Sequence, residues 1–405
     1  MSDRPLVIKF GGTSVGDGAR ISRVAEITTE AALEHPVAVV VSAMSGTTDT
    51  LLGYADATAG RAGRTSTGAT REGSIAELHR TLSERHLRAA REAVSPEHLG
   101  KVEQRLSTLL EQLVGALEAP VENPAARRAQ VAAHGERLSA EILAGALRSA
   151  GTPAAVVAGD PIATNAGFDG AHVDAAETHR RCSRYVAPLL CEGTVPVVPG
   201  YVGRSPEGSA TTLGRGGSDL SATVLGRALG SGEVWIMSDV DGVLDADPRL
   251  VPGATLLPRL SYREAGLFAA LGAKVLHPKT MEPASEAGIE VLVRNTFNLG
   301  CAGTRVSGSE DGPGLRCVAL RRRFAVEVPC VPGHKRKAAA VVCIGSPVDG
   351  DLARGLDRLH EAGISPLHAG TATAGLVFVV VADAAEEALR TLHAGLLSST
   401  EEVVA

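Results

Sequence analysis

"PLVIKFGGTSVGDGAR", Pro5–Arg20, sets the pattern for the whole chain. An apolar run at residues 6–10 is followed by a glycine-rich turn and then by the start of a helix-like pattern. A buried strand, a glycine turn and a helix start are the parts of a βα unit. "PVAVVVSAMSG", Pro36–Gly46, repeats this pattern. Because buried strands alternate with helices, the sequence predicts an α/β fold with a central, mainly parallel sheet.

Length and composition narrow the class of protein. The 405 residues predict two or three domains. The net charge of −6 and the 3% aromatic content argue against nucleic acid and membrane surfaces as partners. We identify no signal peptide and no apolar run of transmembrane length. The six cysteines lack CxxC or metal-like spacing, so we expect reduced, buried thiols in a cytoplasmic protein.

Changes in pattern along the chain indicate the domain organisation. Residues 53–150 have helical periodicity, and strand-like runs return between residues 153 and 295. "SGSEDGPG", Ser307–Gly314, has the composition of a linker. Residues 315–405 alternate short strands with helices. We therefore expect a large α/β domain over residues 1–306, a linker over 307–314 and a small α+β domain over 315–405.

The first candidate binding motif is "VIKFGGTSVG", in which Lys9 precedes Gly11 and Gly12. Glycines allow backbone amides to approach an anion closely, and the lysine adds a point charge. The motif is not a Walker sequence, because the lysine stands before the glycines. A plain turn with a surface lysine is the alternative interpretation.

The second candidate is "TTLGRGGSDLSATVLG", Thr211–Gly226. Arg215 offers a planar fork for a carboxylate or phosphate. Ser218 or Asp219 is predicted to cap a helix whose N-terminus can hold an anion. We expect Asp219 either to orient a lysine or to help hold a substrate ammonium; alternatively it only caps the helix. Arginine and aspartate together favour an amino-acid ligand over a bare phosphate.

Three further segments are weaker signals. "SDVDGVLDADPRL", Ser238–Leu250, has the acidic residues of an EF-hand but not its spacing, so we predict no metal site there. Lys274, among small residues near a helix end, is placed to reach a phosphate. Glu136 in "HGERLSAEIL" is a candidate for binding an ammonium, although a solvated helix charge is the more common interpretation.

Taken together, the motifs resemble those of aspartokinases, in the amino-acid kinase superfamily. "KFGGTSV", "VVSAMSGTTDTLL", "HGERLSAEIL", "TTLGRGGSD", "DVDGVLDADPR" and "GAKVLHP" occur in the family's order, from Lys9 to about Thr304. The resemblance implies the amino-acid kinase fold, with residues 53–150 as a helical substrate-side region and about 205–306 as the nucleotide-binding part. It implies ATP-dependent phosphorylation of the side-chain carboxylate of L-aspartate, the first step of the aspartate-family amino-acid pathway. Mg²⁺ would be carried on the nucleotide.

The resemblance also implies residue roles. Lys9 would neutralise the transferring phosphoryl group, oriented by Asp219, and Gly11 and Gly12 would donate amides to it. Arg215 would pair with the substrate α-carboxylate and Glu136 with its α-ammonium. The implied acceptor-binding residues are Ser42, Thr48, Glu136, Arg215 and Ser218. The implied nucleotide-binding residues are Ser238, Asp239, Leu244, Asp247, Arg249, Lys274 and Val275.

The C-terminal region departs from the family pattern. Residues 315–328 resemble the beginning of a first ACT-type module whose helix and effector-contacting strand are missing, and residues 338–397 resemble a second module alone. ACT-type modules imply pairing into a homodimer or a higher homo-oligomer. Leu244 stands where the family often has an aromatic residue, so adenine packing is expected to differ.

Two alternatives remain open. The chain can be a kinase of the same superfamily for another amino acid or carboxylate in a specialised pathway; the Arg215 and Glu136 pair disfavours acetylglutamate. It can also be a non-catalytic amino-acid sensor, but intact Lys9, Arg215, Asp219 and Lys274 argue against lost turnover.

The shortened ACT-type region predicts weakened or altered feedback inhibition. We expect excess lysine, excess threonine and both together to leave most of the kinase activity in place. The measurement is the initial rate at saturating ATP and aspartate over a series of effector concentrations. Strong inhibition at sub-millimolar lysine or threonine would contradict this prediction.

Overall fold

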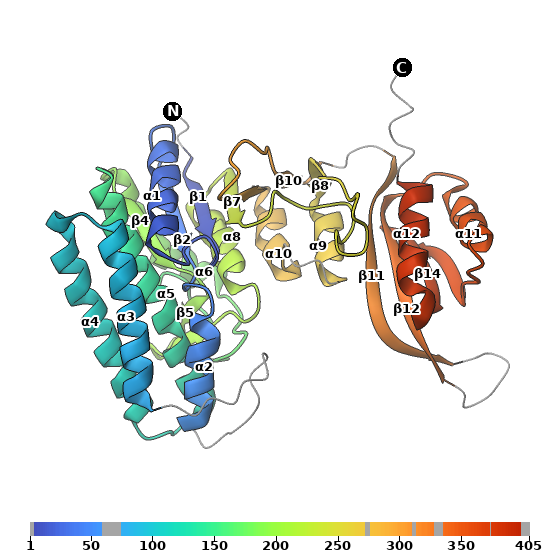
Figure 1. The fold of residues 1–405 in the computed structure, drawn as a ribbon. Coiled ribbons are helices and arrows are strands. Elements are labelled where there is room, and N and C mark those ends of the chain that lie inside the picture. Colours follow the sequence, from blue (N-terminus) through green and yellow to red (C-terminus); the bar gives the residue numbers. More distant parts are fainter. Residues whose placement is uncertain are drawn as a thin grey trace. The chain divides into compact units, whose positions relative to one another are not determined.

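The computed structural model describes residues 4–58, 74–271, 276–309, 313–327, 335–372 and 374–397 (Figure 1). The chain divides into two compact units, one of residues 1–239 with 282–301 and one of 240–281 with 302–405. The expected boundary at residues 307–314 does not coincide with this division, because residues 240–281 pack with the C-terminal part of the chain. Each unit is described by itself below.

A parallel sheet organises the first unit and confirms the predicted fold class. Its strands follow the order β3-β4-β2-β1-β7-β9, and every neighbouring pair is parallel. All residues of the central strands β1 and β2 are buried, which explains why every residue in them except Lys9 is apolar. The strands are β1 (Leu6–Phe10), β2 (Val37–Val41), β3 (Ala154–Val156), β4 (Val195–Pro199), β7 (Glu233–Ser238) and β9 (Glu290–Asn295). A separate antiparallel hairpin joins β5 (Val202–Arg204) to β6 (Ala210–Thr212).

Helices surround this sheet, and helix α5 lies at the centre of a helical layer. It contacts α1, α2, α3 and α4, and most of its residues from Val131 to Leu147 are buried (Figure 1). A helix buried on all sides needs small and apolar residues around its circumference, which "AAHGERLSAEILAGAL" supplies apart from a few polar positions. The helices are α1 (Gly18–Ala32), α2 (Thr47–Thr58), α3 (Ile75–Ala93), α4 (Pro96–Glu118), α5 (Pro124–Ser149), α6 (Ala175–Tyr185), α7 (Ala187–Cys191) and α8 (Gly217–Leu229).

The second unit contains a small parallel pair and a four-stranded antiparallel sheet. Strand β8 (Arg259–Ser261) pairs in parallel with β10 (Thr304–Ser307), and α9 (Tyr262–Ala270) follows β8. Helix α10 (Pro278–Ala287) contains the boundary between the units. The antiparallel sheet has the order β11-β12-β14-β13. Its elements are β11 (Gly314–Glu327), β12 (Lys335–Ser346), α11 (Asp351–Glu361), β13 (His368–Ala372), β14 (Gly375–Val381), the short 3₁₀ helix η1 (Ala382–Ala384) and α12 (Ala385–Leu396).

Strand β11 corrects one expectation about the C-terminal region. The sequence predicted that residues 315–328 begin a separate first module. Instead β11 pairs with β12 over nearly its whole length, as the edge strand of the same sheet as residues 338–397. The described residues therefore form one ACT-like ββαββα module, in which the extra strand satisfies the hydrogen bonds of β12.

This module shares a hydrophobic core with residues 245–254 of the same unit. Ala246 and Val251 pack in one cluster with Leu315, Val318 and Val341 of the antiparallel sheet. The Val318 N–H donates a 2.7 Å hydrogen bond to the Asp245 carbonyl oxygen. Buried apolar contacts and a backbone hydrogen bond thus join the predicted nucleotide segment to the ACT-like sheet.

A buried polar contact reinforces this junction. The Asp245 carboxylate accepts hydrogen bonds from the Thr255 N–H at 2.9 Å and the Thr255 hydroxyl at 2.8 Å. His393 of α12 brings Nε2 within 3.2 Å of Asp245 Oδ1, and both side chains are almost fully buried. Because a buried carboxylate is costly without partners, this contact constrains how α12 sits on the loop.

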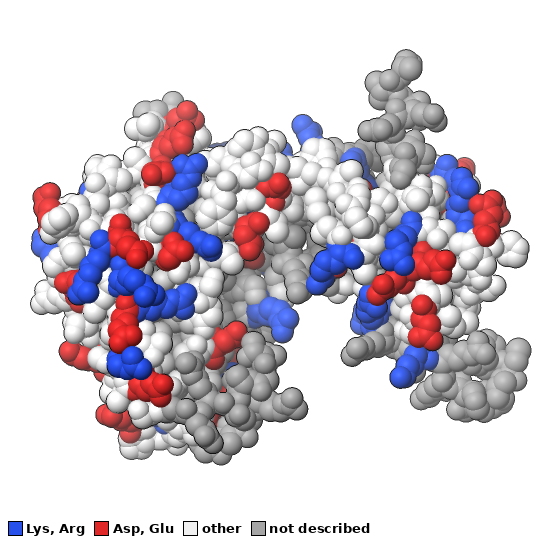
Figure 2. Space-filling view, in the orientation of Figure 1, with Lys and Arg blue, Asp and Glu red and all other residues white. Residues whose placement is uncertain are grey.

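The outer charges of the first unit alternate in sign on the face that Figure 2 shows. Exposed ion pairs lie on the surface helices, for example Arg23–Glu26 on α1 and Arg80–Glu84 on α3. Exposed pairs of this kind contribute little to stability. Among the described residues, no helix is both long enough and apolar enough to span a membrane.

Glycines in two helices provide a test of the close packing around α5. A Cβ atom on Gly135 would lie 2.8 Å from the Ala43 Cβ, whereas one on Gly115 of α4 would meet no atom within 4 Å. We expect Gly135→Ala to destabilise the protein by about 1–3 kcal/mol through overpacking. The control Gly115→Ala should instead stabilise it by about 0.5–1 kcal/mol, because alanine favours helix. Urea unfolding measures both, and equal effects of the two substitutions would refute the expectation.

Candidate active site

One pocket of the first unit, of about 440 Å³, collects all of the predicted acceptor-binding residues together with Lys9 and Asp219. Its walls come from the carboxyl ends of β1 and β2, from α2 and α5, and from the glycine loop that begins α8. Ligands of open α/β sheets bind at this end of the strands. The lining residues that the sequence singled out are Lys9, Ser42, Thr48, Glu136, Arg215, Ser218 and Asp219.

An ion pair between Lys9 and Asp219 lies in the wall of this pocket. Lys9 Nζ is 2.5 Å from Asp219 Oδ1, and the two side chains are only 10% and 15% exposed. Lys9 belongs to the buried central strand and Asp219 to the first turn of α8, so the pair joins the sheet to the helix. A carboxylate this close fixes the direction of the lysine ammonium.

The glycine turn after β1 approaches other backbone segments closely. The Gly11 N–H donates to the Met237 carbonyl oxygen at 3.1 Å, so this amide is already used inside the fold. The predicted donor role of Gly11 therefore requires that bond to break. A Cβ on Gly12 would lie 2.7 Å from the Ala43 carbonyl oxygen, which explains why a glycine stands there. The donor role of Gly12 stays a prediction.

The loop "GRGGSD" turns through two left-handed glycines into α8. Gly214 and Gly216 have φ of 77° and 71°, which side-chain-bearing residues rarely adopt. Gly216 is the N-cap of α8, so the prediction that Ser218 or Asp219 caps the helix was wrong. Both instead lie in its first turn and face the pocket. Arg215 is exposed beside them, with its guanidinium accessible to a ligand.

Glu136 is a carboxyl group buried inside α5 at the base of the pocket. Burial raises the pKa of Glu136 to about 8, and backbone groups of Glu136 and Ala43 and the charge of Arg137 offset only part of this effect. Among the described residues, none forms a hydrogen bond with its Oε2 atom. A buried oxygen of this kind is suited to accept a hydrogen bond from a cation that enters the pocket.

His134, two residues earlier on α5, has a structural environment. Its Nδ1 lies 2.9 Å from the Gln130 carbonyl oxygen one helical turn back. Burial, and secondarily the charge of Arg137, lowers the pKa of His134 to about 4. The imidazole is therefore neutral at pH 7, and it does not line the pocket.

Five further lining residues were not among the predicted site residues. Ala43, Asp49 and Leu52 belong to the segment "VVSAMSGTTDTLL", whereas Asp169 and Tyr201 lie outside the quoted motifs. Tyr201 has a backbone φ of 65°. A Cβ atom on Gly217 would lie 2.6 Å from the Cδ2 atom of the Tyr201 ring, so the ring packs directly against this glycine. A non-glycine residue in this conformation marks a constrained position. Only the spatial arrangement reveals Asp169 and Tyr201, because neither belongs to one of the quoted motifs.

The predicted nucleotide-binding residues are divided between the units. Ser238 ends β7, the strand paired with β1, and Asp239 follows it in the first unit. Leu244, Asp247 and Arg249 belong to the second unit, where Arg249 Nε and Asp247 Oδ1 are 2.9 Å apart. Lys274 and Val275 lie outside the described residues. The roles of all seven therefore stay predictions.

Comparison with known proteins is consistent with this geometry. The model of the amino acid kinase family matches residues 4–295. The chain is 38% identical to Aspartokinase 2, chloroplastic, of Arabidopsis thaliana over 310 residues, which are 75% of this chain and 55% of that protein. It is 32% identical to the aspartokinase of Chlamydia muridarum over 332 residues, 80% of this chain and 69% of that one.

A solved structure agrees over nearly the whole chain. E. coli aspartokinase III in complex with lysine and aspartate superposes with a TM-score of 0.80 and 25% identity, covering 97% of this chain and 99% of that one. The chain spans about half the length of the plant relatives that it matches. The chain therefore belongs to the amino acid kinase family and, within it, to the aspartokinases.

Proposed function

We propose that the protein transfers a phosphoryl group from ATP to the side-chain carboxylate of L-aspartate, giving L-4-aspartyl phosphate. The observation that carries this proposal is the single pocket lined by Lys9, Asp219, Arg215 and Glu136. The ammonium of Lys9, fixed by Asp219, would face a phosphoryl group. The guanidinium of Arg215 would bind an α-carboxylate, and the buried carboxyl group of Glu136 would bind an α-ammonium. No observation favours a different acceptor or a sensor without turnover.

The chemistry asks little of the protein beyond positioning. A carboxylate acceptor is ionised at pH 7, so the reaction needs no general base. Arg215 and Glu136 would hold the two ends of the amino acid, while Ser42 and Thr48 would orient the reacting carboxylate. Lys9, fixed by Asp219 at 2.5 Å, would place positive charge on the transferring group. Catalysis then follows from alignment and neutralised charge.

The remaining parts of the proposal concern the ligands, the magnesium ion, the location and the oligomeric state. The E. coli relative binds aspartate and lysine. Among the described residues there is no group of three or more metal-ligating side chains, and we propose that Mg²⁺ enters on the nucleotide. Magnesium would neutralise phosphate charge when bound. ATP, a cytoplasmic location and a homodimer or higher homo-oligomer complete the proposal.

The acceptor assignment is tested by ADP release across a panel of amino acids. We expect turnover with L-aspartate and at least about a hundredfold lower kcat/KM in Lys9→Ala and in Arg215→Ala, the scale of losing one charge-stabilising group. Lys101→Ala, which removes an exposed lysine of α4 outside the pocket, is the matched control and should behave as wild type.

Circular dichroism and unfolding curves check that the Lys9→Ala and Arg215→Ala proteins remain folded. Turnover with another acid and none with aspartate would show that the acceptor is that other acid. No turnover with any acid would favour the sensor. Wild-type rates in either variant would overturn the site assignment.

Glu136 predicts a linked pH dependence of activity and stability. Its pKa of about 8 in the free protein means that the carboxylate form, which pairs with an ammonium, grows as the pH rises toward 8. We therefore expect kcat/KM for aspartate to rise between pH 6 and 8. Glu136→Gln should lower kcat/KM and remove its rise between pH 6 and 8.

Stability should change in the opposite direction. The folded protein holds this proton to a higher pH than the unfolded chain, whose glutamate pKa is near 4.5. The contribution of Glu136 to stability is thus complete below pH 4.5 and is lost as the pH rises through 8, by up to about 5 kcal/mol. Urea unfolding of ligand-free Glu136→Gln should lack this loss. Equal pH slopes for the variant and wild type would contradict the environment assigned to Glu136.

A further inference from the structure

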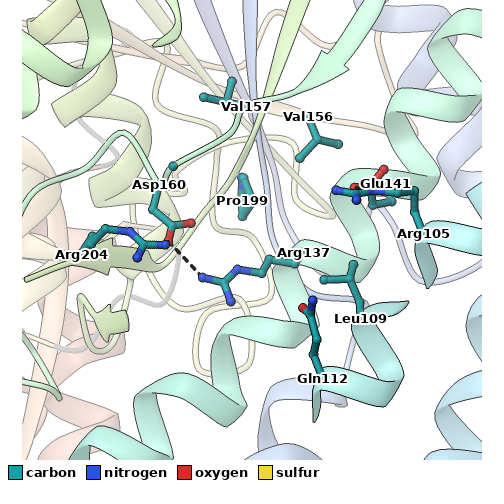
Figure 3. Close-up of a pocket in the computed structure, with 11 residues that line it drawn as sticks. Arg105, Leu109, Gln112, Arg137, Glu141, Val156, Val157, Asp160, Pro199 and Arg204 are labelled. Carbon is teal, nitrogen blue, oxygen red and sulfur yellow. Dashed lines mark hydrogen bonds and ion pairs between the residues drawn. The ribbon is translucent and has the colours of Figure 1, made fainter. Parts of the chain in front are cut away.

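A second pocket of the first unit, of about 230 Å³, shares no lining residue with the candidate active site. It lies beside the carboxyl ends of β3 and β4, between α4 and α5 (Figure 3). Its polar side chains converge from three elements and the loop after β3. They are Arg105 and Gln112 of α4, Arg137 and Glu141 of α5, Asp160 after β3, and Arg204 of β5.

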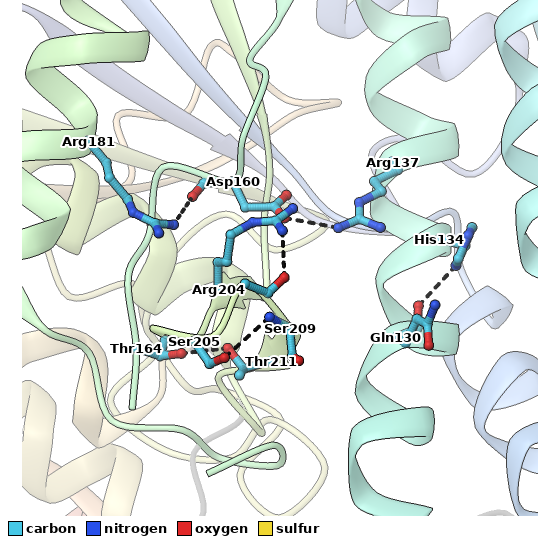
Figure 4. Close-up of polar contacts among 11 residues, drawn as sticks. Gln130, His134, Arg137, Asp160, Thr164, Arg181, Arg204, Ser205, Ser209 and Thr211 are labelled. Carbon is cyan, nitrogen blue, oxygen red and sulfur yellow. Dashed lines mark hydrogen bonds and ion pairs between the residues drawn. The ribbon is translucent and has the colours of Figure 1, made fainter. Parts of the chain in front are cut away.

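Asp160 is the centre of the polar contacts in this pocket (Figure 4). Its Oδ2 atom accepts from Arg137 Nη2 at 3.0 Å and from Arg204 Nη2 at 2.7 Å. The Arg181 Nη1 group donates to the Asp160 carbonyl oxygen at 3.2 Å. Asp160 is 8% exposed and has a φ of 43°, an uncommon value for a residue with a side chain. These contacts hold the guanidinium groups of Arg137 and Arg204 at the pocket wall.

The arginines retain donors that these contacts do not use. A guanidinium has five N–H groups. Arg204 uses Nη2 for Asp160 and Nη1 for the Gly208 carbonyl oxygen, while its Nε is buried and has no hydrogen-bond partner among the described residues. The described contacts of Arg137 use only its Nη2 group. The buried Nε of Arg204 is closed to a ligand, so the donors that the two side chains can offer to the cavity are their remaining Nη N–H groups (Figure 3).

The balance of charge in the pocket is positive. Arg105, Arg137 and Arg204 face two carboxylates, Glu141 and Asp160, which leaves one positive charge in excess. Arg105 is the most exposed of the three at 63%, with Nε 3.2 Å from Glu141 Oε1 at the pocket rim. Planar guanidinium groups bind oxyanions through parallel N–H donors, and the Gln112 amide adds a neutral donor.

We propose that this pocket binds the oxyanion group of a small metabolite, either a phosphate or a carboxylate. The oxyanion contacts the free N–H groups of Arg137 and Arg204, with Arg105 closing the open side. A volume of about 230 Å³ accommodates a molecule of a few non-hydrogen atoms. Because Glu136 and Arg137 are consecutive residues of α5 and line different pockets, the two pockets lie against different faces of one helix.

Direct binding tests this site without reference to kinase activity. Inorganic phosphate and acetate are titrated separately into the full-length protein by calorimetry, at constant ionic strength set with chloride. Lys9→Ala serves as the background, because it removes the cation of the other pocket that attracts phosphate. We expect saturable binding of one of the two anions, and the arm that saturates identifies phosphate or carboxylate as the ligand group.

Three variants in that background locate the site. Arg204→Gln and Arg105→Gln should each weaken binding by about tenfold or more, the loss of a charged hydrogen bond. Arg91→Gln is the matched control: it removes an arginine that is 62% exposed and paired with Glu103 away from the pocket. It should bind as the background does. Thermal unfolding verifies each fold, and Arg105 is exposed enough that its replacement leaves the core intact.

Three results would overturn the proposal. The first is that neither anion binds saturably in the Lys9→Ala background. The second is unchanged affinity in folded Arg105→Gln and Arg204→Gln. The third is an equal loss of affinity in Arg91→Gln, which would show only a nonspecific response to protein charge.

Discussion

The contact that organises the candidate active site is the ion pair of Lys9 with Asp219. Lysine is rarely buried, and an unpaired ammonium in the centre of a parallel sheet would strongly destabilise it. Asp219 removes most of this cost at 2.5 Å, but only because α8 begins directly after the left-handed Gly216 and points its first turn at β1. The glycine loop, the helix and the strand are therefore parts of one arrangement.

Much of this arrangement is predictable because its signals are local. The fully buried β1 and β2 gave continuous apolar runs, and the glycines of "KFGGTSV" and "TLGRGGSD" marked turns that other residues resist. The pairing of β11 with β12 was not predictable in the same way, because an edge strand and the start of a new module have the same alternating pattern. The cap of α8 was misassigned because a left-handed glycine and a serine both precede helices.

Residues that line a pocket without forming a motif are the other limit of the sequence. Tyr201 and Asp169 come together with Glu136 only through the path of β4, β5 and β6 around α5. The pKa of Glu136 likewise follows from the burial of α5 and not from its neighbours in sequence. On an isolated helix the same glutamate would be a solvated charge. Long-range packing thus converts an ordinary residue into one with unusual protonation, which is typical of functional sites.

The shared core of the second unit has a consequence for dissecting the protein. Ala246 and Val251 belong to the same cluster as Leu315, Val318 and Val341, although the predicted linker lies between them in sequence. A fragment cut at residues 307–314 would keep the loop but lose the sheet that covers it, and so would expose apolar surface that favours aggregation. In a chimera that carries the antiparallel sheet of a relative, the side chains of the loop and those of the new sheet would have to pack together again. The natural unit of exchange therefore includes the loop at residues 240–254, not the C-terminal sheet alone.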